Sequence, residues 1–227
     1  MKARLSSGSE LTWHFHEKRD PTFEFLEEPH EYVLQSRRLW SATGVISFVG
    51  WADGQEYYRP EHLIRGSNVH ILTHHEDNGT LESSFVDDAY IGYLMAYQEF
   101  KRVWNFVPRV METPMYHPQH FYGVTPDREG LILDGDAAII ELKSGVMPWW
   151  TKYQTAAQDM AINAWEPVPT FRRRVGVQLS KDGKFKAEEF TDPDDYDGFL
   201  EALRTCQRKG EPKRKIVEAA PIGFSII

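Results

Sequence analysis

Three charged side chains in the middle of the chain are spaced so that they can act on one bound group. Glu141 and Lys143 lie two positions apart, directly after the apolar residues 137–140, which are typical of a buried strand. Because side chains two positions apart on a strand point to the same face, we expect this carboxylate and this amine to share a face. Asp127 precedes them on the neighbouring strand and can reach the same point.

The chemistry of this group indicates a divalent cation. Asp134-Gly135, a pair typical of hairpin turns, separates the strand of Asp127 from the strand of Glu141. Two carboxylates that converge on one point repel each other unless a cation lies between them. Magnesium is the natural occupant, because it binds few carboxylates and keeps several waters.

The same residues carry a family resemblance. Pro126-Asp127 followed by Glu141-Leu142-Lys143 resembles the PD-(D/E)XK nuclease signature, in its RecB-like and phage exonuclease branch. Further segments similar to family motifs follow one another in the family's order: His30-Glu31-Tyr32, the run from Leu39 to Ile46, Arg65-Gly66-Ser67-Asn68-Val69-His70, Glu112 and Tyr153-Gln154. The resemblance covers roughly residues 22–205.

The resemblance implies a fold, a cofactor and roles for individual residues. The fold is an α/β restriction-endonuclease-like core, with a central mixed sheet flanked by helices. The cofactor is one or two Mg²⁺ or Mn²⁺ ions, held by Asp127, Glu141, the backbone carbonyl of Leu142 and His70. Lys143 then orients or deprotonates a water, or stabilises developing charge, and these alternatives remain open.

Three more residues belong to the expected site. Gln154 is the catalytic residue that would contact the substrate strand, as the resemblance implies. The family's tyrosine four residues later is replaced by Gln158, a departure that bears on substrate preference rather than on hydrolysis. Glu112 matches a family strand that carries an additional acidic residue. Gln158 and Glu112 are therefore possible additional site residues.

Each candidate also has a purely structural explanation. Asp127 follows a proline and fits a turn, whereas Glu141 could be a solvated strand end with Lys143 as its ion-pair partner. His70 and His74 are four residues apart, as a zinc pair would be, but the sequence shows no matching third ligand. His74 is equally favourable at a helix end, where the dipole stabilises positive charge.

Length and composition fit one enzyme domain. We expect a single domain over residues 1–227, with a core at about 22–205 and a basic segment at 204–227. No stretch has the length of a signal peptide or membrane span, so a cytoplasmic protein, in a bacterial cell or a phage-infected host cell, is expected. Cys206 is the only cysteine, which excludes a four-cysteine iron–sulfur cluster.

The charge distribution leaves the nucleic-acid interface open. A net charge of −8 is not that of a protein that coats DNA through a uniformly basic surface. Six basic residues and one acidic residue lie between Arg204 and Lys215, and residues 172–174 are three consecutive arginines. Both clusters could contact phosphates, and both could equally be solvated surface.

The elements that must position the site are readable from periodicity and turn signals. We expect strands near residues 31–36, 109–115, 119–127, 129–134, 137–143, 175–179 and 185–190. Helices are expected from 41–43, over 60–74, over 84–104 with Ser84 and Asp87 as a capping pair, over 149–165 and over 192–210 with Asp192 as N-cap and Pro193 as first residue.

These observations predict a metal-dependent DNA nuclease. Resemblance implies an exonuclease acting in phage or bacterial DNA recombination, repair or processing, with a recombination protein as a possible partner. The alternatives are a site-specific endonuclease, an RNA-processing nuclease of the same fold, and a non-catalytic nucleic-acid-binding member. Polarity, strand preference and oligomeric state are not indicated by the sequence.

Overall fold

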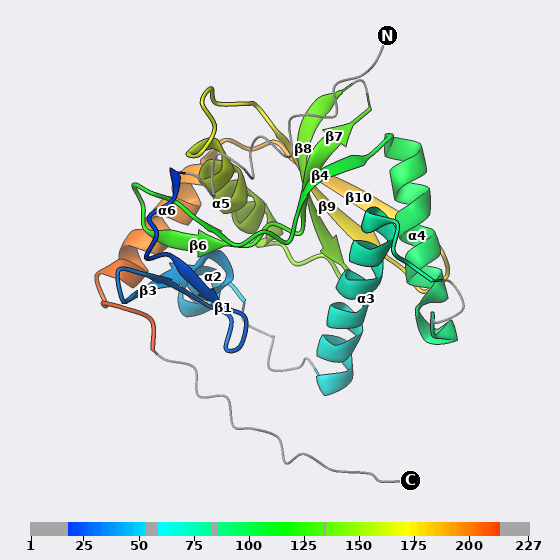
Figure 1. Cartoon of the computed structure of the whole chain (residues 1–227), viewed down its shortest axis with the longest axis horizontal. Helices are drawn as coiled ribbons and strands as arrows, with labels where there is room; N and C mark the ends of the chain where they lie inside the picture. The colour runs from blue at the N-terminus through cyan, green and yellow to red at the C-terminus, as the bar shows by residue number, and fades with distance from the viewer. Residues whose placement is uncertain (1–17, 53–58, 83–85, 134, 214–227) are drawn as a thin grey trace, which may run out of the picture.

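The protein is a mixed α/β structure with two sheets and helices packed around them (Figure 1). The computed structural model describes residues 18–52, 59–82, 86–133 and 135–213. The helices in these ranges are α2 (Ala42–Phe48), α3 (Pro60–Asn78), α4 (Asp88–Trp104), α5 (Thr151–Asn163) and α6 (Asp194–Gln207). The predicted α/β class, with a restriction-endonuclease-like core, is confirmed.

The first sheet is small and includes the first three strands of the chain. Its strand order is β1-β2-β3-β6-β5, with β3 and β6 parallel. The bounds are β1 (Glu24–Leu26), β2 (Glu31–Leu34), β3 (Arg37–Ser41), β5 (Met115–Tyr116) and β6 (Tyr122–Val124). The sequence predicted one strand over 31–36, but Gln35 and Ser36 both have positive φ and turn the chain into β3.

The second sheet carries the predicted site strand. Its order is β10-β9-β8-β7-β4, with β8 and β9 parallel and the other pairs antiparallel. The bounds are β4 (Val107–Met111), β7 (Arg128–Ile132), β8 (Asp136–Lys143), β9 (Arg173–Leu179) and β10 (Phe185–Phe190). The predicted hairpin is formed by β7 and β8, which pair from Ile132 opposite Asp136. Asp134 lies outside the described residues.

Helices cover the second sheet on both faces (Figure 1). One face packs against α3 and α4 through a core that includes Val69, Tyr97, Phe100, Ile140, Leu142 and Val177. On the other face α5 lies against β8 and β9 and packs against α6. Alternate residues of β8 therefore serve different layers, since Ile139 belongs to the core beneath α5 and α6 whereas Ile140 belongs to the core beneath α3 and α4.

Local signals set the helix starts with small shifts from prediction. Ser41 accepts a hydrogen bond from the Gly44 amide and caps α2 as expected. Asp87 caps α4, whereas Ser84 lies outside the described residues. The N-cap of the last helix lies one residue later than predicted, at Pro193 instead of Asp192. Pro193 occupies that position with helical φ and ψ, and Asp192 Oδ1 accepts from the Asp194 amide.

The predicted strand over 119–127 is a strand only at β6, and a turn at residues 118–120 precedes it. Phe121 has a positive φ of 53°, which restricts β6 to three residues. His117 lies buried in this turn, and its Nδ1 accepts hydrogen bonds from the amides of Gln119 and His120, each at 3.2 Å. Burial, followed by the charge of His120, lowers the pKa of His117 to about 4. The turn is thus built around a neutral imidazole.

Among the described residues, no helix is long and apolar enough to cross a membrane.

Candidate active site

The candidate site lies where two antiparallel strands separate. Pairing between β7 and β8 ends with Arg128 opposite Ile140, so β8 continues for three residues beyond its neighbour on that side. These three residues are Glu141, Leu142 and Lys143. Because β7 no longer covers that edge, polar groups from other elements can approach it there.

The side chain of Asp127 contacts the part of β8 that β7 does not pair with. Asp127 immediately precedes β7, and its Oδ2 accepts a hydrogen bond of 2.7 Å from the Leu142 backbone amide. The carboxylate takes the place of a strand carbonyl on the free edge of β8. The side chain of Leu142 is buried in the core beneath α3 and α4. The side chain of Asp127 is 13% exposed, so it borders the cleft without being freely solvated.

Glu141 and Lys143 share a face of β8, as their spacing predicted. Lys143 Nζ donates to Glu141 Oε1 at 2.6 Å and lies 3.4 Å from Gln154 Oε1. Glu141 is only 2% exposed, which contradicts the alternative of a solvated strand end. Gln158 Nε2 donates to the second oxygen, Glu141 Oε2, at 2.9 Å. Helix α5 thus presents both of its glutamines to this face.

His70 and Glu112 approach Asp127 from the other side. His70, on α3, has its Nδ1 3.6 Å from Asp127 Oδ1 and 3.6 Å from Glu112 Oε1. Glu112 follows β4 with a positive φ of 44°, and its amide donates to the carbonyls of Pro126 and Asp127. His74 Nδ1 is 3.6 Å from Glu112 Oε2. The structure therefore brings together all the predicted acidic residues and His70.

A buried arginine holds this side of the site in place. Arg128 is fully buried, and its guanidinium contacts Asp77 Oδ2 at 2.7 Å, Glu112 Oε1 at 3.1 Å and Thr73 Oγ1 at 3.0 Å. Asp77 also accepts from the Tyr97 hydroxyl at 2.6 Å. The network ties α3 and α4 to the start of β7. Arg128 was not predicted as part of the site, although it follows Asp127 directly in the sequence.

The electrostatics of the site are those of an anionic centre with too little positive charge. Burial, followed by the charge of Glu141, raises the pKa of Asp127 to about 6, against the opposing effects of His70 and Lys143. Asp127 in turn raises the pKa of His70, although burial acts in the opposite direction. Burial alone would raise the pKa of Glu112, but His70 and Arg128 together outweigh it and lower the pKa.

The residues fit a hard divalent cation by chemistry. In the described parts of the chain, no three His, Cys, Asp or Glu side chains already surround one point as metal ligands. The raised pKa of Asp127 nevertheless shows that a second buried carboxylate lacks compensating charge. Oxygen donors of this kind suit Mg²⁺ or Mn²⁺. Asp127, Glu141, the Leu142 carbonyl and His70 are the groups that would hold the ion.

The site opens into two hollows that meet at Gly66 and His70. The larger, of about 600 Å³, is lined by Glu112, Asp127 and both glutamines of α5. Its remaining walls come from the first sheet and α2, and include His30, Tyr32, Ser41 and Thr43. The smaller, of about 470 Å³, lies beside Lys143 and is lined by Arg65, Leu63, Val146 and Trp150. The candidate site therefore borders two hollows, with Asp127 lining the larger and Lys143 the smaller.

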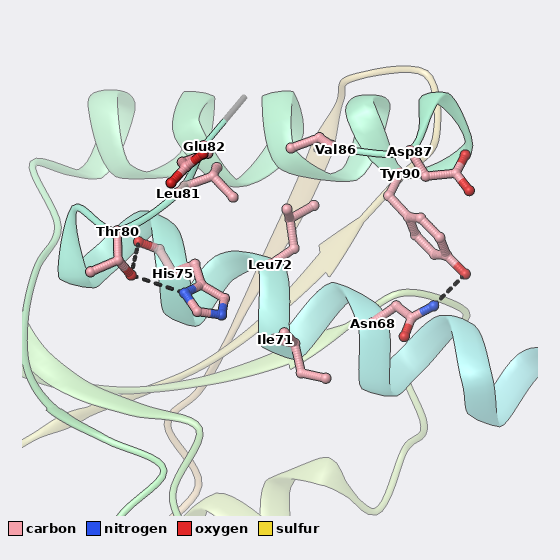
Figure 2. A pocket seen from close by; sticks show the side chains of 10 residues that line it. All are labelled: Asn68, Ile71, Leu72, His75, Thr80, Leu81, Glu82, Val86, Asp87 and Tyr90. Carbon is pink, nitrogen blue, oxygen red and sulfur yellow. Dashed lines mark hydrogen bonds between the residues drawn. The ribbon is translucent and has the colours of Figure 1, made fainter. Parts of the chain in front are cut away.

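A third hollow lies between α3 and α4, and neither Asp127 nor Glu141 lines it (Figure 2). Its polar groups largely bond to one another, since Asn68 donates to the Tyr90 hydroxyl at 2.8 Å and His75 Nδ1 lies 2.9 Å from Thr80 Oγ1. Asp87 is the N-cap of α4. These contacts account for Asn68, Tyr90, His75, Thr80 and Asp87 without a further ligand.

Two of the three arginines at 172–174 are buried and form internal ion pairs. Arg172 and Arg174 are 2% and 3% exposed and pair with buried acidic residues, Glu129 and Asp195 respectively. Arg173 pairs with Glu189 on the adjacent strand at 2.6 Å. Both interpretations are therefore wrong for Arg172 and Arg174, whereas Arg173 is partly exposed. Of the C-terminal basic cluster, residues 214 and 215 lie outside the described residues.

The two tryptophans before α5 differ in environment. Trp150 is 8% exposed and lies beneath Lys143, whose Nζ is 5.5 Å from the ring centroid. Trp149 is 57% exposed and contacts Trp51 and Tyr153 at ring distances of 5.9 Å each. Core packing accounts for Trp150, whereas Trp149 keeps an accessible ring near the smaller hollow.

Comparison with known proteins adds little to this description. No protein-family model matches the chain, and no curated protein matches it. The crystal structure of an alkaline exonuclease, LHK-Exo from Laribacter hongkongensis, is 17% identical over 75% of this chain and 92% of that chain, with a TM-score of 0.32. LHK-Exo in complex with dAMP is 19% identical over the same shares, with a TM-score of 0.28. Similarity this low assigns no role to any residue of this chain.

Proposed function

We propose that this chain is a divalent-metal-dependent DNA nuclease that acts as an exonuclease. The observation that carries the proposal is the juxtaposition of Asp127, Glu141 and Lys143 at the free edge of β8. Asp127 reaches that edge through the Leu142 amide, and Lys143 contacts Glu141 directly. Two buried carboxylates beside one ammonium, with Asp127 and Lys143 each lining a hollow, form an arrangement suited to phosphodiester hydrolysis.

The roles of the residues follow from their positions. A bound Mg²⁺ or Mn²⁺ would supply an acidified water and neutralise charge on the phosphate. Asp127 and Glu141 would bind the ion, with His70 at its side. Lys143 would hold a proton at Nζ near the attacking water or stabilise developing charge. Gln154, which borders the cleft and lies 3.4 Å from Lys143, would contact the cleaved strand.

We further propose that the exonuclease acts in phage or bacterial DNA recombination, repair or processing. The sequence motifs, which follow one another in the family's order, support this proposal. These motifs fall on the elements that form the cleft. The segment that ends in His70 lies on α3, and Gln154 lies on α5. The predicted DNA partner is consistent with a cleft that is open on two sides of His70.

A substrate panel tests the proposal. Linear duplex, circular duplex, single-stranded DNA and RNA would each be incubated with the protein in Mg²⁺, Mn²⁺, Ca²⁺ or EDTA. We expect degradation of linear DNA from its ends in Mg²⁺ or Mn²⁺, and binding without turnover in Ca²⁺, whose larger and looser coordination shell positions the attacking water poorly. Cleavage that survives exhaustive EDTA treatment would overturn the metal mechanism.

A matched pair of variants separates the site from general effects on the fold. Glu141→Gln removes a charged ligand beside Asp127, so it should lose turnover and bind Mn²⁺ measurably but more weakly. Glu188→Gln makes the same chemical change on the exposed face of β10 and should behave as wild type. Nicking of circular DNA would favour an endonuclease, and cleavage of RNA alone would favour an RNA-processing enzyme. Binding of DNA without any cleavage would favour a non-catalytic protein.

A further inference from the structure

Gln158 is a buried amide with one hydrogen-bond partner. It is 1% exposed, and its Nε2 donates to Glu141 Oε2 at 2.9 Å. Its Oε1 is buried and accepts no hydrogen bond from the described residues. A buried amide oxygen without a partner is unfavourable, so packing alone does not account for a glutamine here. Within the part of the chain that the structure describes, the side-chain amide makes its hydrogen bond to the carboxylate of the candidate site.

The position of this contact defines what it can do. Lys143 binds Glu141 Oε1 and Gln158 binds Oε2, so the carboxylate is held between an ammonium and an amide. An ammonium can move with its flexible side chain. The Gln158 side chain is 1% exposed, whereas the Lys143 side chain is 21% exposed, so packing restricts the amide more than the ammonium. The amide is therefore the more fixed of the two groups that hold the Glu141 carboxylate.

We propose that Gln158 is a positioning residue that orients the Glu141 carboxylate for binding a divalent cation. The inference rests on the proposed function, because it assumes that Glu141 is a metal ligand. Groups that hydrogen-bond to a metal ligand fix its orientation, and their loss typically weakens metal affinity by roughly 10- to 100-fold. Gln158 also lines the larger hollow together with Asp127, the other expected carboxylate ligand.

Binding of Mn²⁺ to the full-length protein, measured by calorimetry without DNA, tests this role. Gln158→Met keeps the length and approximate volume of the side chain but removes the donor. We expect its Kd for Mn²⁺ to rise by roughly 10-fold or more. Gln98→Met, the same change on the exposed face of α4, should leave the Kd unchanged. Circular dichroism and thermal unfolding would establish that each variant is folded.

A double-mutant cycle distinguishes positioning from a general structural role. If Gln158 acts through Glu141, the Gln158→Met change should have no further effect on Mn²⁺ affinity in a Glu141→Gln protein. An equal loss in both backgrounds, or an unchanged Kd in a folded Gln158→Met protein, would overturn the inference. Absence of Mn²⁺ binding in the wild-type protein would instead refute the metal site of the proposed function, so the two failures are distinguishable.

Discussion

The buried carboxylate of Asp127 should destabilise the metal-free protein at neutral pH. Its pKa is raised from 3.8 to about 6, first by burial and then by the charge of Glu141. A carboxyl with a raised pKa in the folded state is neutral there at low pH. Stability is therefore highest below the unfolded pKa and is lost as the pH rises from about 4 through 6.

The size of this loss follows from the shift. A difference of about two pKa units corresponds to about 3 kcal/mol of unfolding free energy above pH 6. Asp127→Asn removes the titration but keeps an oxygen that can accept from the Leu142 amide. In EDTA at pH 7, we expect this variant to be more stable than wild type by up to about 3 kcal/mol, with the difference largely gone at pH 4.

Urea denaturation between pH 4 and 7.5 measures the effect, with and without Mn²⁺. Added Mn²⁺ should stabilise the wild-type protein and not Asp127→Asn, which narrows the gap between them. Asp136→Asn, an exposed change at the start of β8, serves as control and should shift stability little at any pH. A constant difference between Asp127→Asn and wild type from pH 4 to 7, or a less stable variant at pH 7, would refute the reasoning.

Three further predictions concern residues around the site and the fold. His70→Ala should weaken divalent-ion binding and turnover less than loss of a carboxylate does, and excess Mn²⁺ should partly restore cleavage because imidazole binds Mn²⁺ better than Mg²⁺; equal defects in both ions would contradict this. Arg128→Met leaves the Asp77 carboxylate buried and should cost about 3–5 kcal/mol in urea unfolding, whereas Arg173→Met on a partly exposed pair should cost less than about 1 kcal/mol. Because the pKa of His117 is lowered to about 4 in the folded state, only the unfolded state takes up a proton between pH 6.5 and 4. The free energy of unfolding should therefore fall by about 3 kcal/mol over this range. A His117→Asn protein whose unfolding free energy has the same pH dependence as that of wild type would refute this.

The core of the site was predictable because it depends on short-range periodicity. The apolar run before Glu141 predicted the buried strand, and the spacing of Glu141 and Lys143 placed both on one face. Asp127 was expected on the strand itself. It lies one residue before β7, and that position is what frees its side chain to reach the Leu142 amide.

Other features depend on long-range packing that no local pattern encodes. The contact of Gln158 with Glu141 requires α5 to lie against β8, which the sequence of either element does not specify. The burial of Arg172 likewise depends on Glu129, on a strand 43 residues earlier. A run of arginines therefore suggested a surface, whereas the fold uses two of them as internal ion-pair partners.

The sharpest test of the central claim is single-turnover cleavage of end-labelled linear DNA by Lys143→Ala in Mg²⁺, with binding measured separately in Ca²⁺. Because the Lys143 ammonium lies beside Glu141 at the edge of β8, it should act on the transition state more than on bound DNA. We predict that wild-type protein degrades the DNA, whereas Lys143→Ala binds it with similar affinity and does not cleave it. Wild-type cleavage rates in Lys143→Ala would contradict the assignment of the site.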